Sequence, residues 1–226
     1  NTTPPEHIIA GIDTNFFVTE APLTVAGKVH QGRSLFVSLP LLRILNTEEA
    51  DSVLAHELAH FKGGDTASGA TLGPKLMQFS RYTYMLYENV STKLFFHLFM
   101  FYRLVFEFAL QKDSREQEFR ADRLAAQLIS PQAIINSLIK IKAFAAYRAQ
   151  VEENLYEQDK RHDKTLGIVQ SVEAGLKIYA HSEVFLDDVN AGEVPHPFDS
   201  HPPLAERMAN VGYVVDEEDF SSIVAE

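Results

Sequence analysis

The most informative stretch of this chain is His56-Glu57-Leu58-Ala59-His60. Asn46 or Thr47 can cap a helix that leads into it. Histidines four residues apart share a helix face, so both imidazoles can reach one metal ion. The glutamate after the first histidine lies beside the open coordination position, where it can take a proton from metal-bound water. Alone the pattern is only suggestive, since chance produces it at a rate on the order of a few per cent in a histidine-rich chain.

A catalytic zinc site usually has three protein ligands, and Glu118-Phe119-Arg120-Ala121-Asp122 can supply the third. Glu118 and Asp122 are four residues apart in a helical pattern and therefore face the same way. Glu118 can bind the metal, and Asp122 can accept a hydrogen bond from the second ring nitrogen of a zinc histidine, which we expect to be His56. Taken alone, the two carboxylates are better explained as a solvated face paired with neighbouring arginines. Together with the histidine pair, they favour ligation.

The composition limits the classes of function. The chain has 226 residues, 46% of them apolar, which is enough for one sizeable core, and we expect a single domain over residues 1–226. The formal net charge of -11 argues against nucleic acid as a partner and gives no general attraction to anionic lipid. Cysteine is absent, which excludes thiolate ligands. A zinc ion would therefore be held by imidazole and carboxylate groups.

The pattern along the chain predicts three regions. Residues 1–40 predict a small sheet, because short apolar runs are separated by glycines. Residues 41–129 predict the helices that carry the candidate zinc ligands. Residues 130–226 predict a helical C-terminal part with an acidic, proline-containing loop at 182–203, followed by a short helix and an acidic tail. The apolar runs of the predicted sheet cover residues 8–12, 15–19 and 34–38.

Residues 94–110 are the most apolar part of the chain and hold six phenylalanines. Their length approaches that of a membrane span, but His97, Arg103 and Glu107 interrupt them. On a helical wheel these polar residues gather on one side, which predicts an amphipathic helix with a broad apolar face. That face packs either on the protein core or against a membrane or a hydrophobic partner segment.

Five stretches together resemble the zinc metallopeptidase family that includes bacterial HtpX and the CAAX prenyl endopeptidase of eukaryotic membranes. They follow the family's order and cover most of the chain, so the set is far more specific than the histidine motif alone. We expect one α+β domain of the zincin type: a mainly helical metallopeptidase domain with a small N-terminal β-sheet. The matching stretches are Asn15-Phe16-Phe17, Ala55 to His60, Asp65, Glu118 to Asp122, and Ser200 to Arg207.

The resemblance implies a site of the gluzincin type. By resemblance, His56, His60 and Glu118 would bind one zinc ion per chain, and Glu57 would be the catalytic base. Asp65 belongs to the matching set, but its simplest interpretation is a polar residue that ends the first zinc-site helix.

The resemblance also implies roles for residues outside the ligand set. Asn15 and its strand would border the substrate cleft, and this strand could hold an extended peptide by edge pairing. His201 and Arg207 would lie near the metal and assist catalysis, because a positioned donor stabilises the oxyanion of peptide hydrolysis. Without the resemblance, His201 is better explained as a loop residue and Arg207 as the partner of Glu206 in a surface ion pair.

We therefore expect a zinc metalloendopeptidase that hydrolyses polypeptides, and the resemblance implies membrane-associated protein quality control. One alternative is a prenyl-peptide (CAAX-type) processing protease, whose lipid the Phe-rich segment could shelter. Another is a zinc-stabilised, non-catalytic chaperone-like module, although Glu57 counts against it because a structural site needs no base. In a third alternative, the acidic loop at 182–203 covers the cleft and holds the enzyme inactive.

The expected location follows from the same resemblance. Many family members carry transmembrane helices before the first motif and between the two zinc motifs, whereas this chain has only the interrupted segment 94–110 between them. The chain begins with Asn1, so we expect a processed product or a fragment whose spans lie upstream. The expected location is membrane-associated, with a soluble or peripheral variant as the alternative.

Overall fold

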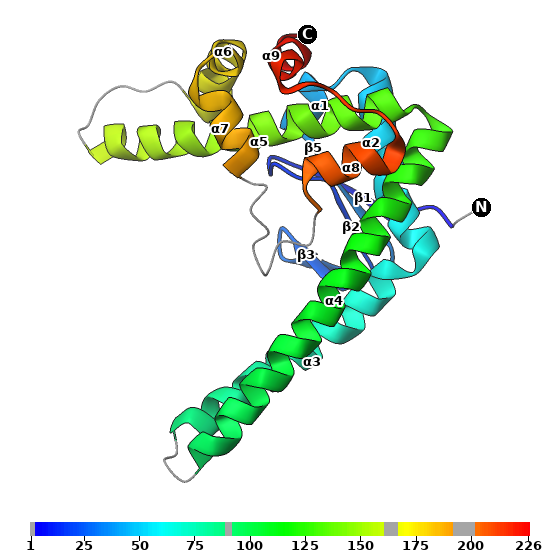
Figure 1. Cartoon of the computed structure of the whole chain (residues 1–226), viewed down its shortest axis with the longest axis vertical. Helices are drawn as coiled ribbons and strands as arrows, with labels where there is room; N and C mark the ends of the chain where they lie inside the picture. The colour runs from blue at the N-terminus through cyan, green and yellow to red at the C-terminus, as the bar shows by residue number, and fades with distance from the viewer. Residues whose placement is uncertain (1–2, 89–91, 161–166, 192–201) are drawn as a thin grey trace.

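The computed structural model describes residues 3–88, 92–160, 167–191 and 202–226 as a mainly helical α+β fold with small N-terminal sheets (Figure 1). The strands are β1 (His7–Gly11), β2 (Phe17–Thr19), β3 (Leu23–Val25), β4 (Lys28–His30) and β5 (Ser34–Ser38). The helices are α1 (Leu39–Ile44), α2 (Thr47–Gly63), α3 (Asp65–Glu88), α4 (Lys93–Leu128), α5 (Pro131–Lys160), α6 (Ile168–Ala180), α7 (Val184–Ala191), α8 (Leu204–Val211) and α9 (Glu217–Ala225).

The main sheet has the order β1-β5-β2, with β1 parallel and β2 antiparallel to β5. These are the three strands that the apolar runs predicted, which confirms the small N-terminal sheet. The separate β3–β4 hairpin was not predicted, since each of its strands has only three residues and its Leu23 and Val25 alternate with exposed side chains. Its turn places Ala26 and Gly27 at positive φ, 49° and 77°.

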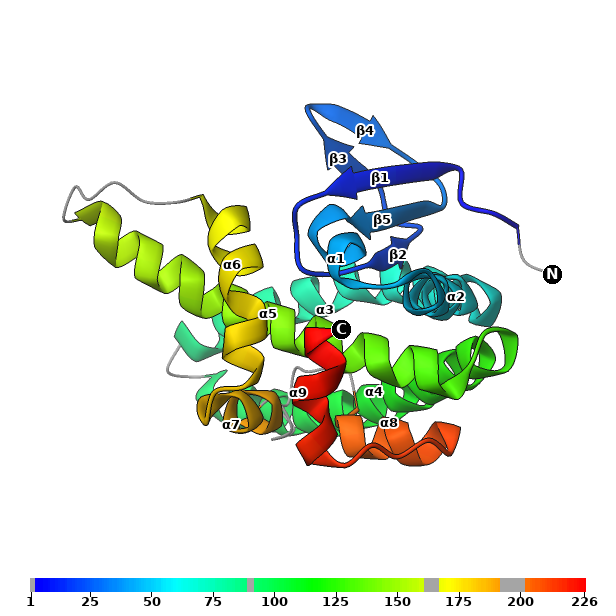
Figure 2. The same cartoon turned by 90° about the horizontal axis from the view of Figure 1, so that it is seen from above.

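Helix α2 carries the histidine motif, and its ends are fixed by local chemistry. The Asn46 side chain accepts a hydrogen bond from the Glu49 backbone N–H, and the Glu49 side chain accepts one from the Asn46 N–H, which forms a capping box. Gly64 ends the helix in the left-handed conformation, with φ of 75°. In Figure 2 the sheet lies on one side of α2, and α4 and α8 lie on the other.

A buried ion pair joins α2 to α5. The ammonium nitrogen of Lys140 lies 3.0 Å from the carboxylate of Glu49, and both side chains are almost fully buried. Removing one partner of such a pair leaves an uncompensated buried charge, which costs about 3–5 kcal/mol. The pair therefore fixes the position of α5 relative to the start of α2, and no local pattern in the sequence predicts it.

Helices α3 and α4 form a long antiparallel arm that extends away from the rest of the molecule (Figure 1). The C-terminal part of α4 packs against α2, whereas its Phe-rich N-terminal part packs against α3. The interpretation that residues 94–110 pack on the protein core is therefore wrong. No helix within the described residues is both long and apolar enough to cross a bilayer. The large apolar side chains exposed on the arm include Met77, Tyr82, Tyr84, Tyr87, Leu94, Phe95, Leu98, Phe101, Tyr102 and Val105.

Two C-terminal helices lie where the sequence predicted irregular structure. Helix α7 occupies part of the predicted loop at 182–203, because Phe185 is buried with its ring edge-on to Tyr179. Helix α9 occupies the predicted acidic tail, because Phe220 and Val224 are buried against the C-terminal core. In both segments a few apolar side chains at helical spacing outweigh the acidic composition.

Candidate metal centre

Three potential ligands from α2 and α4 converge at one point. The Nε2 atoms of His56 and His60 lie 3.3 Å apart. The Glu118 carboxylate reaches both, with Oε2 at 3.5 Å from Nε2 of His56 and Oε1 at 3.4 Å from Nε2 of His60. The structure therefore brings together the three residues that the sequence predicted as ligands.

The spacing of these atoms fits a tetrahedral zinc site. Ligand atoms about 2.0–2.1 Å from one zinc ion in tetrahedral geometry lie roughly 3.3–3.4 Å from each other. The separation of 3.3 Å between the two imidazole nitrogens matches that value, and each of these nitrogens lies 3.4–3.5 Å from one oxygen of the Glu118 carboxylate. Two imidazoles and one carboxylate are a donor set that zinc accepts, and three protein ligands leave a fourth position for water.

A carboxylate contacts Nδ1 of each histidine, the ring nitrogen that does not face the other candidate ligands. Nδ1 of His56 lies 2.9 Å from Oδ1 of Asp122, as the sequence predicted. Nδ1 of His60 lies 3.0 Å from Oδ2 of Asp65, the first residue of α3. Such contacts fix the ring so that Nε2 faces the metal and raise its basicity. The interpretation of Asp65 as merely a helix-ending residue missed this contact, which arises because Gly64 turns the chain back toward His60.

Arg207 of α8 binds the supporting carboxylate directly. Its Nε and Nη2 atoms donate hydrogen bonds to the two oxygens of Asp122 at 2.8 and 2.6 Å, and Nη2 lies 3.9 Å from Oε2 of Glu118. The alternative of a surface pair with Glu206 is wrong, because Arg207 is buried and Glu206 pairs with Arg115 at 3.6 Å. Arg207 therefore lies near the candidate ligands, as predicted.

The buried charges shift one another's pKa. Burial lowers the pKa of His56, but hydrogen bonds to Asp122 and Glu118 outweigh it and raise that pKa to about 9. Burial and the nearby His56 lower the pKa of the His60 imidazole. Burial raises the pKa of Asp122, yet hydrogen bonds from Arg207 and His56 bring it below its usual value. At neutral pH without metal, His56 is therefore protonated and Asp122 ionised.

Glu57 faces a cavity of about 210 Å³ beside the cluster. Arg207 lies in the same lining, and so does Asn15, which is exposed and immediately precedes Phe16 and the edge strand β2. Four predicted site residues thus meet at this cavity, since His56 also lines it. His201 lies outside the described residues, and its neighbour Pro202 lines the cavity.

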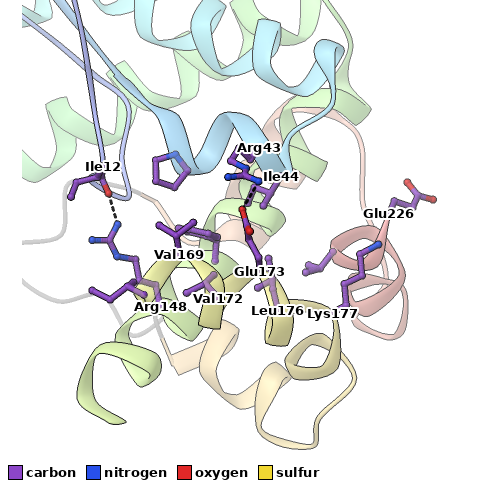
Figure 3. Close-up of a pocket in the computed structure, with 14 residues that line it drawn as sticks. Ile12, Arg43, Ile44, Arg148, Val169, Val172, Glu173, Leu176, Lys177 and Glu226 are labelled. Atoms are coloured by element: carbon purple, nitrogen blue, oxygen red, sulfur yellow. Dashed lines mark hydrogen bonds and ion pairs between the residues drawn. The ribbon is translucent and has the colours of Figure 1, made fainter. Parts of the chain in front are cut away.

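A larger cavity, about 360 Å³, lies between α1, α5, α6 and α9 and shares no lining residue with the cavity beside Glu57 (Figure 3). Its walls are largely apolar, and the charged side chains at its rim pair with nearby groups. Arg43 pairs with Glu173 at 2.7 Å, and Arg148 contacts Glu152 and the carbonyl of Ile12. None of its lining residues belongs to the candidate ligand set, whereas His56 lines the cavity beside Glu57.

Comparisons with known proteins identify a family for the chain. The profile of Peptidase family M48 matches residues 25–215. Protease HtpX of Pasteurella multocida is 28% identical over 210 residues, covering 87% of this chain and 61% of the relative. Protease HtpX of Hahella chejuensis is 27% identical over 188 residues, covering 76% of this chain and 55% of the relative. Protease HtpX homolog 1 of Sulfurisphaera tokodaii is 38% identical over 76 residues, 31% of this chain and 24% of the relative.

The chain thus spans between about half and two thirds of the length of the two HtpX proteins that it matches over most of its own length. No solved structure matches it.

The pKa of His56 predicts a proton release. Zinc binds neutral imidazole, whereas the His56 ring, with a pKa of about 9, carries a second proton at neutral pH. Zinc binding at pH 7 should therefore release at least about one proton per ion, measurable by titration calorimetry in buffers of different ionisation enthalpy. The Asp122→Asn variant removes a contact that raises this pKa, so it should release fewer protons. A release well below one proton in the unmodified chain would show that His56 is not the protonated ligand.

Proposed function

The chain belongs to peptidase family M48, and we propose that it is a zinc metalloendopeptidase that hydrolyses polypeptides. The observation that carries the proposal is the spacing of His56, His60 and Glu118, which fits three ligands of one tetrahedral zinc ion with a position left for water. Glu57 supports catalysis over a purely structural site, because it lines the same cavity as the proposed ligand His56.

The residues around the proposed zinc site have separate roles in the proposed reaction. Bound zinc would polarise the scissile carbonyl and lower the pKa of a water molecule toward about 7. Glu57 takes the water proton and delivers it to the leaving amine. Arg207 lies in the cavity lining while Asp122 holds it, so it positions the His56–Asp122 pair and adds positive charge near the developing oxyanion. His201 is proposed as a second oxyanion donor.

An extended substrate can pair with strand β2. This strand is at the edge of the sheet order β1-β5-β2, and Asn15 stands before it at the cavity. Backbone hydrogen bonding along an edge strand gives affinity that does not depend on the substrate sequence. The arrangement suits the cleavage of unfolded or extended chains in membrane-associated quality control. It also allows the prenyl-peptide alternative, which comparison of an unfolded protein with a lipidated peptide as substrates would separate.

We propose that the α3–α4 arm binds an anionic membrane surface. Residues 75–105 cover its exposed apolar side chains and contain four Lys or Arg and one Glu, a net charge of +3 on a chain of -11. The remaining residues carry -14 together, so residues 75–105 are net positive whereas the rest of the chain is net negative. Aromatic side chains beside basic ones are typical of segments that lie in a bilayer interface.

The Glu57→Gln variant tests the peptidase. It retains the ligands but removes the group that accepts the water proton, so kcat/KM on a casein-type substrate should fall by about a hundredfold or more. Zinc content, measured by elemental analysis, should stay at one ion per chain. Cleavage at the normal rate by the variant, or undiminished cleavage after chelation, would refute the mechanism.

Vesicle sedimentation tests the arm. The chain should bind vesicles with phosphatidylglycerol more strongly than neutral ones, and added salt should weaken binding. The double variant Arg81→Glu/Lys93→Glu should lose most of this preference. A control with Lys28→Glu and Lys62→Glu changes the net charge equally, at exposed sites outside the arm, and should keep it. The proposal would be refuted if both double variants lost the preference for anionic vesicles equally, or if the unmodified chain showed no such preference.

A further inference from the structure

We infer that Arg120 is a positioning residue for the proposed metal ligand His60 and that it acts through Asp65. The inference rests on the proposed zinc site and adds to it an outer contact from α4. Arg120 fixes the carboxylate that contacts the His60 ring, and the fixed ring then presents Nε2 to the metal.

Arg120, Asp65 and His60 form a continuous series of contacts. Nη2 of Arg120 donates hydrogen bonds to both oxygens of Asp65, at 2.7 and 2.6 Å. Oδ2 of the same carboxylate lies 3.0 Å from Nδ1 of His60. The Asp65 side chain is only 9% exposed, whereas that of Arg120 is 41% exposed. Because the guanidinium is the more exposed partner, it lies on the outer side of the carboxylate.

The arrangement repeats the one around His56. There Arg207 donates hydrogen bonds to both oxygens of Asp122, and Oδ1 of Asp122 lies 2.9 Å from Nδ1 of His56. Each histidine thus has an arginine–carboxylate pair at its Nδ1 atom. The two arginines differ in burial, because Arg207 is almost fully buried and Arg120 is not. Arg120 can therefore be replaced without opening the core.

A carboxylate that is bound through both oxygens keeps one orientation. Without Arg120, the Asp65 side chain can adopt other rotamers and exchange its contact with the imidazole for water. Loss of the partner of a metal-binding histidine typically lowers metal affinity by about ten- to a hundredfold. Freeing Asp65 from Arg120 should cause a loss at the lower end of this range, because the carboxylate itself remains.

Gly63 provides the space that the Arg120 guanidinium occupies. A Cβ atom at this position would overlap Nη2 of Arg120 and lie 2.8 Å from its Cζ atom, closer than side-chain carbon atoms pack. Gly63 is the last residue of α2 and does not have the positive φ of Gly64, so the backbone there is compatible with alanine. A methyl group at Gly63 would therefore displace the guanidinium without straining the helix end.

The test measures the zinc dissociation constant of the whole chain by competition with a chromophoric chelator. Asp65→Ala should raise this constant by about ten- to a hundredfold, and Arg120→Met by about tenfold. Arg120→Lys retains a charged donor and should recover part of the affinity. Arg123→Met removes another arginine of α4, one that bonds to Asn210, and should leave the constant unchanged. This control accounts for the loss of a positive charge near the site.

A double-mutant cycle separates positioning from a general effect on the fold. Gly63→Ala should weaken zinc binding about as much as Arg120→Met does. The double variant should bind zinc no more weakly than either single variant, because both changes remove the same contact. Alanine is also a better helix former than glycine, so the Tm of the metal-free chain should not fall in Gly63→Ala.

The outcomes distinguish this inference from the proposed function. The inference is overturned if Arg120→Met binds zinc as tightly as the Arg123→Met control, or if the two changes in the double variant weaken binding additively. A chain that shows the expected zinc affinities but cleaves no peptide supports the inference and refutes the peptidase. An unmodified chain that binds no zinc refutes both.

Discussion

The packing of α2 against α4 is the contact on which the rest of the structure depends. It brings His56 and His60 of one helix to Glu118 of the other, at the spacing of ligands around one zinc ion. The same contact buries Glu118 and Asp122 almost completely. Buried carboxylates destabilise a fold unless they are paired, so this helix packing requires nearby positive charge.

Two sources of positive charge meet that requirement. Arg207 of α8 binds both oxygens of Asp122, which joins the C-terminal part of the chain to the site. His56 carries the second charge in the metal-free protein, because its pKa is raised to about 9. Zinc would replace that proton, so the stability of the helix pair and the affinity for metal depend on the same group. Asp65 contacts Nδ1 of His60 as Asp122 contacts Nδ1 of His56.

The sequence predicted the parts of this arrangement that local patterns determine. The cap, predicted at Asn46 or Thr47 and found at Asn46, and the i,i+4 spacings of His56 with His60 and of Glu118 with Asp122 all depend on neighbouring residues. The family resemblance supplied the long-range pairing of the two motifs.

Other features depend on contacts between distant segments and had no such signal. The buried pair of Glu49 and Lys140 is one of them, and the cavity between α2, α5 and α8 is another. The β3–β4 hairpin and helices α7 and α9 were missed because each is short and held by a few tertiary contacts. Residues 94–110 were predicted as an amphipathic helix. Their position in an arm that extends away from the core follows from the pairing of α4 with α3, which is a contact between separate segments.

Diffraction at the zinc absorption edge, on crystals of the zinc-loaded chain, tests the three-ligand site most directly. We expect one anomalous peak within bonding distance of Nε2 of His56, Nε2 of His60 and the carboxylate of Glu118, with a water at the fourth position. A peak held by other residues, or no peak at this cluster in a chain that retains zinc, would contradict the site on which the proposed chemistry rests.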